Sequence, residues 1–237
     1  MQRRRRRFNR ISNRSITDDN SSPSWEFAFI DKGDVMKPLV TQKQLQAMGF
    51  KNATGEMVSA LNRTFVEFSI TTKERIRQFL AQCFVETGQA SLDGPFLTEI
   101  TYVFPINPVY EQQWFDTNRN YGYKYRGGGY IHLTWNGINP KDGQFYDTYQ
   151  QFSDYIGDPK VVSLGANYLA STQELAWRSA GWFWDKYKKV NSVINVESCS
   201  LAEGKLLVET VTQKVQGGQS ALNERKAAYE EAWRVIK

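Results

Sequence analysis

The sequence predicts a mainly α-helical domain with a small β element, preceded by a tail. Three observations predict this class. Apolar residues recur at helical spacing from residue 41 onward, Gly, Pro and Asn mark the turns between these segments, and one aromatic-rich stretch lacks the helical period. A chain of 237 residues with 41% hydrophobic residues is long enough to build one full core. We therefore expect one folded domain over residues 25–237 and a tail over residues 1–24.

The tail is rich in Arg, Asn, Ser and Asp and has almost no large apolar residue, so it is expected to be disordered. It holds seven of the 30 Lys and Arg residues and two of the 25 Asp and Glu residues, which leaves 23 of each sign in residues 25–237. The net charge of +5 therefore belongs to the tail. Two interpretations stay open. The tail is a solubilising extension, or its run from Arg3 to Arg7 contacts a polyanion through an attraction that salt would screen.

Several classes of protein do not match the composition. The single His and two Cys have no zinc-ligand spacing, no Gly-rich phosphate loop follows a strand, and no basic stripe lies outside the Arg run. No apolar stretch is long enough to cross a bilayer, and the basic start of the chain lacks the apolar core of a secretory signal peptide. We predict no metal, no nucleotide or other cofactor and no membrane span. Cys83 and Cys199 are expected to be free thiols.

Helices are expected first over residues 41–50 and 55–68, each bounded by turn-forming residues. A third helix follows, beginning at a capping-box pattern of Thr71 and Glu74 and ending near Gly88. Its apolar stripe comprises Ile76, Phe79, Leu80, Cys83 and Phe84.

Glu86 lies on the flank of that stripe. At about 100° per residue it projects about 20° from Phe79, which places a carboxylate at the edge of the core. Apolar surroundings favour the protonated form of a carboxyl group. Glu99, and less well Asp93, lie in the loop that follows, where a carboxylate with Gly and Thr neighbours stays hydrated and ionised. Two carboxyl groups in different environments are what acid/base catalysis by a carboxylate pair requires.

The aromatic-rich stretch spans residues 102–135 and holds ten aromatic residues among Gly, Asn and Pro, so we expect loop and short strand. Its segment YIHLT alternates, with two apolar side chains on the packed face and three others on a face open to ligand: Ile131 and Leu133 against Tyr130, His132 and Thr134. Most aromatic residues here are expected to pack the loop, and two or three to contact sugar rings: Tyr110, Trp114, Tyr121, Tyr123, Tyr125, Tyr130 and Trp135. The helical pattern then resumes over residues 142–156, 172–189, 201–216 and 220–236, with Trp182 and Trp184 in the core and a tight turn at Gly127 to Gly129.

Four segments resemble, in order and spacing, the family 19 glycoside hydrolases: FSITTKERIRQFLAQCFVETG, YKYRGGGYIHLT, SAGWFWDKY and VTQKVQGGQSALNERKAAYEEA. This family includes chitinases and related phage and bacterial peptidoglycan hydrolases. The resemblance covers about residues 38–237. It implies a two-lobed, lysozyme-like domain with a cleft between the lobes and a small β element at the cleft.

The resemblance also implies roles for individual residues. Glu86 falls on the family's general acid and Glu99 on its general base. In inverting members the base faces the acid across a gap wide enough to hold the water molecule that it activates. Thr134 falls where a hydroxyl holds that water, and Arg225 falls where an Arg orients the carboxylates and would keep Glu99 ionised. The expected substrate-binding residues are His132, Tyr130, Gln216, Arg225, Tyr125 and Asn139.

The sequence departs from the family pattern mainly at substrate-binding positions. His132 replaces a Gln, Gly128 an Arg, Gln216 an Asn, Val85 a His and Ile138 an Asn. These changes affect sugar specificity more than reaction type. His132, the single histidine, is either a substrate contact or a hydrogen-bonded structural residue.

The leading interpretation is an inverting hydrolase of β-1,4 bonds in polymers that contain N-acetylglucosamine. Peptidoglycan is favoured over chitin, because a basic tail suits an anionic wall and a chain without a signal peptide suits a wall reached after release or by non-classical export from the cytoplasm, as for a phage endolysin. Two alternatives remain: a catalytically inactive glycan-binding protein of a virion, spore or wall, and a lytic transglycosylase that uses Glu86 alone. The expected partners are glycan chains, and we expect a monomer.

Overall fold

The segments that were predicted as helices from residue 41 onward are mainly helical in the structure. The computed structural model describes residues 37–89, 94–95, 97–98, 121–138 and 143–237, and the folded unit is Pro38–Lys237. The tail and the boundary predicted at residue 25 lie outside the described residues and stay predictions. In chain order the elements are α1 (Gln42–Met48), α2 (Gly55–Glu67), α3 (Lys73–Glu86), α5 (Tyr121–Lys124), β1 (Asn136–Ile138), β2 (Phe145–Asp147), α6 (Thr148–Ile156), α7 (Lys160–Leu164), α8 (Ala166–Leu169), α9 (Gln173–Trp182), the π-helix η3 (Phe183–Tyr187), the 3₁₀-helix η4 (Val190–Val193), α10 (Leu201–Gln216) and α11 (Leu222–Val235).

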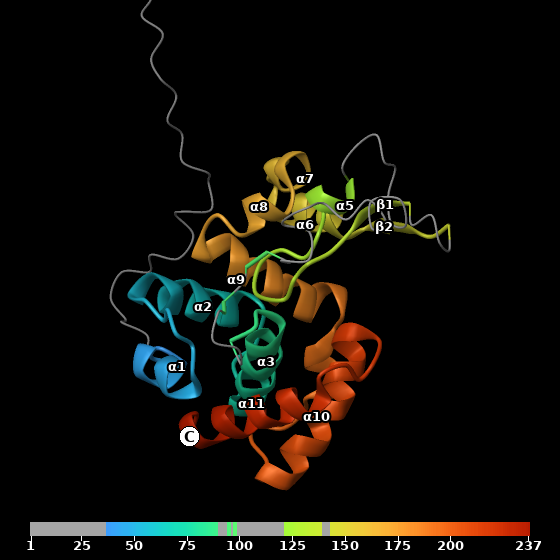
Figure 1. The fold of residues 1–237 in the computed structure, drawn as a ribbon. Helices are drawn as coiled ribbons and strands as arrows, with labels where there is room; N and C mark the ends of the chain where they lie inside the picture. Colours follow the sequence, from blue (N-terminus) through green and yellow to red (C-terminus); the bar gives the residue numbers. More distant parts are fainter. Residues whose placement is uncertain (1–36, 90–93, 96, 99–120, 139–142) are drawn as a thin grey trace, which may run out of the picture. The chain divides into compact units, whose positions relative to one another are not determined.

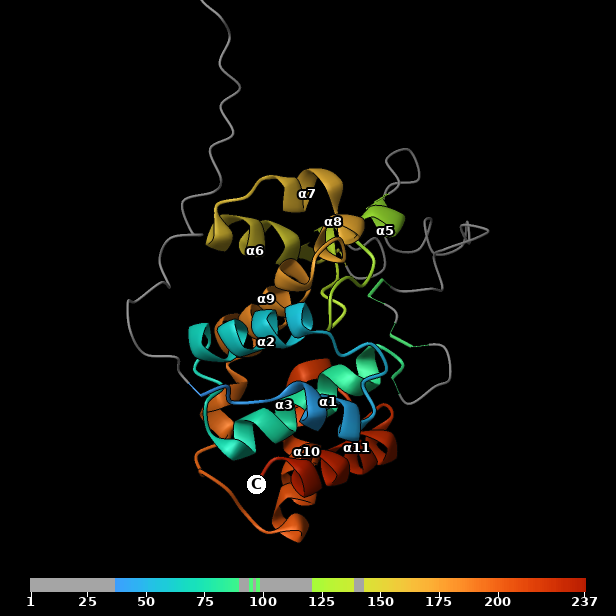
Figure 2. The ribbon, with the colours of Figure 1, turned by 90° about the vertical axis from the view of Figure 1, so that its left-hand side faces the viewer.

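The elements of this unit lie on the two sides of α9, which packs against α2. Both views place α6, α7 and α8 on one side and α1, α3, α10 and α11 on the other (Figures 1 and 2). Helix α3 packs mainly against α11. The described part of the chain holds one sheet, an antiparallel pair in which Asn136 lies opposite Asp147 and Ile138 opposite Phe145. The predicted mainly α class with a small β element is confirmed.

Aromatic side chains of α3, α9 and η3, together with Tyr130, form the centre of the core. The Phe79 ring lies edge-on to Trp184 at 5.2 Å between centroids, and Trp177 stacks on Tyr130 at 3.5 Å. Trp182 is also buried, so the predicted core positions of both tryptophans on the AGWFW segment are confirmed. Such large apolar surfaces dominate the burial that holds the two sides of α9 together.

The start of α3 differs from the predicted capping box. Thr72 is the N-cap, and its hydroxyl accepts from the Arg75 backbone N–H at 3.2 Å. Glu74 does not reach back to the cap. Its buried carboxylate accepts instead from the Gln78 amide at 2.9 Å and from the Tyr229 hydroxyl at 3.1 Å. The capping-box prediction is therefore wrong, because partners on α3 and α11 satisfy this carboxylate inside the core.

The predicted strand at residues 130–134 is also absent. Gly129 and His132 have φ angles of +73° and +48°, in the left-handed region, so the chain turns instead of extending. A Cβ at Gly129 would lie 2.9 Å from the backbone oxygen of Ala176, so only glycine allows this close approach to α9. The strands lie just after the turn, and the helix predicted from residue 142 begins at Thr148.

Cys83 and Cys199 are both free thiols, as predicted. Within the described ranges, no helix combines the length and apolar character that a membrane crossing needs.

Candidate functional site

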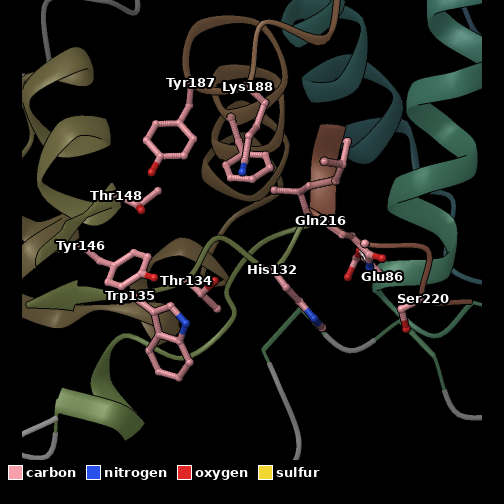
Figure 3. Close-up of a pocket in the computed structure, with 14 residues that line it drawn as sticks. Glu86, His132, Thr134, Trp135, Tyr146, Thr148, Tyr187, Lys188, Gln216 and Ser220 are labelled. Atoms are coloured by element: carbon pink, nitrogen blue, oxygen red, sulfur yellow. Dashed lines mark hydrogen bonds between the residues drawn. The ribbon is translucent and has the colours of Figure 1, made fainter. Parts of the chain in front are cut away.

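A pocket of about 520 Å³ opens beside the C-terminal end of α3 (Figure 3). We call it the Glu86 pocket. Residues from both sides of α9 line it: Glu86, Ile131, His132, Thr134, Trp135, Tyr146, Thr148, Phe183, Tyr187, Lys188, Val215, Gln216, Gly218 and Ser220. Its mixed aromatic and polar wall is the composition expected of a small-ligand site.

Glu86 is the last residue of α3, and its carboxylate is held through one oxygen. Oε1 accepts from Nη2 of Arg225 at 2.7 Å and from Nε2 of Gln216 at 2.8 Å. Oε2 has no hydrogen bond within the part of the chain that the structure describes. The side chain is 17% exposed. The carboxyl group is therefore oriented at one oxygen while the other remains available to a ligand.

Arg225 is the buried support of this carboxylate. Arg225 belongs to α11, and its side chain is 2% exposed. The guanidinium also donates to Oε1 of Gln82 and, at 3.1 Å, to the backbone oxygen of Ser220. Gln82 in turn donates to the Thr212 hydroxyl at 3.0 Å. A network of hydrogen bonds thus joins α3, α10 and α11 below the pocket.

The family resemblance implied that Arg225 orients the carboxylates of the cleft and keeps Glu99 ionised. The partner found is Glu86 itself, and Glu99 lies outside the described residues.

The wall opposite Glu86 comes from the turn before β1 and from the hairpin. Thr134, Trp135 and Tyr146 lie together on this side in Figure 3, with Thr148, at the start of α6, above Tyr146 in the view. Trp135 has a φ of +73°, and its backbone N–H donates to the backbone oxygen of Tyr125 at 3.0 Å. The chain therefore turns sharply at this residue. The fold thereby brings the Thr134 hydroxyl and Glu86 to one pocket.

A π-helical turn supplies a third wall. The backbone N–H of Lys188 donates to the oxygen of Phe183, five residues earlier, at 2.8 Å. This wider turn places Phe183, Tyr187 and Lys188 on the pocket, and π-turns inside helices often mark functional sites. The local pattern is that of a continuous α-helix, so sequence periodicity did not reveal these residues.

The structure separates the predicted site residues into three groups. Glu86, Thr134, His132 and Gln216 line the pocket, and Arg225 lies behind it. Tyr125 and Tyr130 are buried and do not line it. Glu99 and Asn139, with Asp93, Tyr110 and Trp114, lie outside the described residues.

The two buried tyrosines have structural partners. The Tyr130 hydroxyl donates to the Gln173 side-chain oxygen at 2.9 Å, and the Tyr125 hydroxyl donates to the Val162 backbone oxygen at 3.0 Å. Burial raises the pKa of Tyr130 well above its ordinary value of 10.0. Both residues were predicted to bind substrate. For Tyr130 that prediction followed from the alternation of the YIHLT segment, which assumes an extended chain.

Cys83 lies one turn before Glu86 but is not placed to act as a nucleophile. Burial, and then the charge of Glu86, raise the pKa of its thiol well above 9.0, so the reactive thiolate is suppressed. Among the described residues, no three His, Cys, Asp or Glu side chains come together as a metal-binding group.

Comparisons with known proteins identify the fold. No protein-family model matches the sequence, and no curated protein sequence matches it. Among solved structures, the chain is similar to chitinase C from Streptomyces griseus HUT6037, with a TM-score of 0.55 and 17% identity over 92% of this chain and 84% of that one. It is also similar to a Glu-to-Gln mutant of chitinase C, with a TM-score of 0.54 and 17% identity over 86% of this chain and 95% of that one. The predicted lysozyme-like fold, of the kind found in chitinase C, is confirmed.

Proposed function

We propose that this chain is a glycoside hydrolase that cleaves β-1,4 bonds in polymers containing N-acetylglucosamine, with Glu86 as its general acid. One observation carries the proposal: the Glu86 carboxyl is oriented through Oε1 by Arg225 and Gln216, while Oε2 is available to a ligand in the pocket. The chitinase-like fold supports the same reaction class.

In this mechanism the available oxygen of Glu86 delivers a proton to the leaving glycosidic oxygen. Positioning is a large part of such catalysis, because a donor held in place avoids the entropy cost of finding its geometry. Glu99, with the Thr134 hydroxyl, is proposed to activate a water molecule on the opposite face of the sugar, which inverts the anomeric carbon.

The pocket walls suit a sugar chain. Trp135, Tyr146 and Tyr187 line the Glu86 pocket and offer aromatic faces on which the C–H faces of pyranose rings stack. Thr134, Thr148 and Ser220 add hydroxyls for hydrogen bonds to the sugar substituents. Chitin and peptidoglycan both contain the β-1,4-linked N-acetylhexosamine backbone that this arrangement would bind.

The test compares wild type, Glu86→Gln and Glu99→Gln on purified chitin and on purified peptidoglycan, with product ends identified by mass spectrometry. Glutamine at position 86 retains a carbonyl oxygen to accept from Arg225 but has no proton to give, so we expect activity to fall by about 10²- to 10⁴-fold. Loss in both variants, with reducing ends from wild type, supports a hydrolase that needs both carboxyl groups.

Other outcomes identify the alternatives. Anhydro ends from wild type, with Glu99→Gln still active, indicate a lytic transglycosylase. Wild type that retains glycan in a pull-down assay but releases no product is a binding protein, and the enzyme proposal is then wrong.

A further inference from the structure

We propose that Lys188 makes the Glu86 pocket selective for glycan chains that carry carboxylates, the chemistry of peptidoglycan strands, over neutral chitin. This inference rests on the proposed function, because it assigns a substrate class to the same pocket. Three observations carry it: the placement of Lys188 by the π-turn, the balance of charge in the pocket, and the aromatic pair beneath the ammonium group.

The π-turn aims the Lys188 side chain into the pocket. Lys188 follows the last residue of η3, and its ammonium lies 5.5 Å from the Phe183 ring centre and 5.6 Å from that of Tyr187. Figure 3 places the ammonium on the pocket side of its wall, beside Tyr187 and across from Trp135 and Thr134. A regular α-helical turn would rotate this residue differently relative to Phe183.

No carboxylate of the described residues pairs with Lys188. Among the described lining residues, Glu86 is the acidic side chain and Lys188 the basic one, and Glu86 already has Arg225 as its partner. No ion pair joins Lys188 to an acidic side chain within the described ranges, whereas its neighbour Lys186 pairs with Asp185 at 2.8 Å.

The surroundings of Lys188 add to this imbalance. Burial, and then the positive charge of Lys214 on α10, lower the pKa of Lys188. A half-buried ammonium near a second cation is stabilised when an anion binds beside it. The described wall around Lys188 therefore favours a negatively charged group of the ligand.

The ligand that fits this wall combines a sugar ring with a carboxylate. Phe183 and Tyr187 stack with ring centres 5.5 Å apart and 23° between their planes, which provides an aromatic surface next to the ammonium. In peptidoglycan, alternate sugars bear a lactyl ether whose carboxyl is free or extended by a peptide with carboxylates of its own. Chitin carries no anionic group, so it offers no carboxylate to pair with the Lys188 ammonium.

The experiment measures kcat/KM for three substrates: a chitin hexasaccharide, peptide-free peptidoglycan strands and peptide-bearing strands. Wild type is compared with Lys188→Gln, which removes the charge, and with Lys188→Arg, which keeps it. Lys189→Gln is the matched control, because Lys189 is the exposed neighbour that does not line the pocket. The readout is the ratio of kcat/KM for each charged strand to that for the hexasaccharide.

We expect Lys188→Gln to lower this ratio about tenfold, the size of one charge-assisted hydrogen bond. Lys188→Arg and Lys189→Gln should keep the wild-type ratio, and added salt should lower the ratio in wild type. A loss with peptide-free strands identifies the lactyl carboxylate as the partner, and a loss confined to peptide-bearing strands identifies the peptide. An unchanged ratio in Lys188→Gln overturns the inference.

Equilibrium binding of the same three glycans separates this inference from the proposed function. A wild type that cleaves none of them disproves the hydrolase. In that case, about tenfold weaker binding of charged strands by Lys188→Gln, relative to the hexasaccharide, still supports charge selection. Equal relative affinities in the two proteins overturn it.

Discussion

Arg225 on α11 donates Nη2 to Oε1 of Glu86, the last residue of α3, across 2.7 Å. The guanidinium is buried, while the carboxylate reaches the pocket surface. Residues 139 positions apart in the chain thus form one unit, in which packing of the helices sets the direction of the proposed catalytic carboxyl.

Replacing Arg225 is expected to damage both stability and activity. Arg225→Gln removes the cation from a buried network and leaves Glu86 and Gln82 without their shared donor, so the free energy of unfolding should fall by about 3 to 5 kcal/mol. Urea unfolding measures this loss. Lys226→Gln is the control, because the ion pair that Lys226 of the same helix makes with Glu209 is partly exposed to solvent, and its loss should cost about 1 kcal/mol or less. Equal unfolding midpoints for wild type and Arg225→Gln would contradict the network.

Gln216 is expected to act on turnover more than on stability. Its amide donates to Oε1 of Glu86 at 2.8 Å from the last residue of α10, so Gln216→Ala removes one of the two donors that orient the carboxyl. We expect kcat to fall about tenfold, the value of one hydrogen bond to a charged group. Gln219→Ala is the matched control, since Gln219 donates to the Glu209 backbone oxygen away from Glu86. Similar kcat values for the two variants would show that Gln216 does not position the acid.

Gly181 is expected to be required for the contact between α9 and α2. A Cβ at this position would overlap the side chains of Phe68 and Thr64 in the core. Gly181→Ala should therefore lower the free energy of unfolding by about 1 to 3 kcal/mol despite the better helix propensity of alanine. Gly55→Ala at the start of α2 is the control, because a Cβ there meets open space and should leave stability equal or higher. A stabilised Gly181→Ala would refute the packing described for these helices.

Cys199 is expected to make stability fall at alkaline pH. Burial, and then the charge of Glu74, raise the pKa of its thiol from 9.0 to about 11. Between these values the unfolded chain releases the thiol proton while the folded chain keeps it, so the free energy of unfolding decreases as pH rises, and this contribution is fully present below pH 9. Unfolding in urea at pH 8, 9, 10 and 11 measures the slope. Cys199→Ala should have a shallower decline than wild type, and identical slopes would exclude this thiol as a source.

The helices were predictable from the sequence because their apolar residues repeat at the helical period, which depends on local spacing alone. The first residues of α3 and α6 were predicted less accurately than the helices themselves. Glu74 matched a capping box locally, yet its carboxylate is satisfied by Tyr229 on a distant helix. His132 alternated like a strand residue, yet the turn that packs Gly129 against α9 gives it a left-handed backbone.

The candidate site also contains one part that the sequence predicted and one that it did not. Glu86 was identified from its place on a helix flank and from the resemblance of the surrounding segments, and the pocket forms around it. The wall that holds Lys188 was not predicted, because a π-turn leaves no periodic signal distinct from an α-helix over five residues.

The sequence by itself determined the helical class, the chitinase-like fold and the candidate acid, since each depends on local pattern or on the order of segments. Only the tertiary structure decided which polar groups meet at that acid. Gln216 and Arg225 lie 130 and 139 residues from Glu86 along the chain, and the packing of α10 and α11 against α3 brings them to one oxygen. Periodicity records which face of a helix is buried, but the partner of a buried polar group is set by the geometry of the assembled helices.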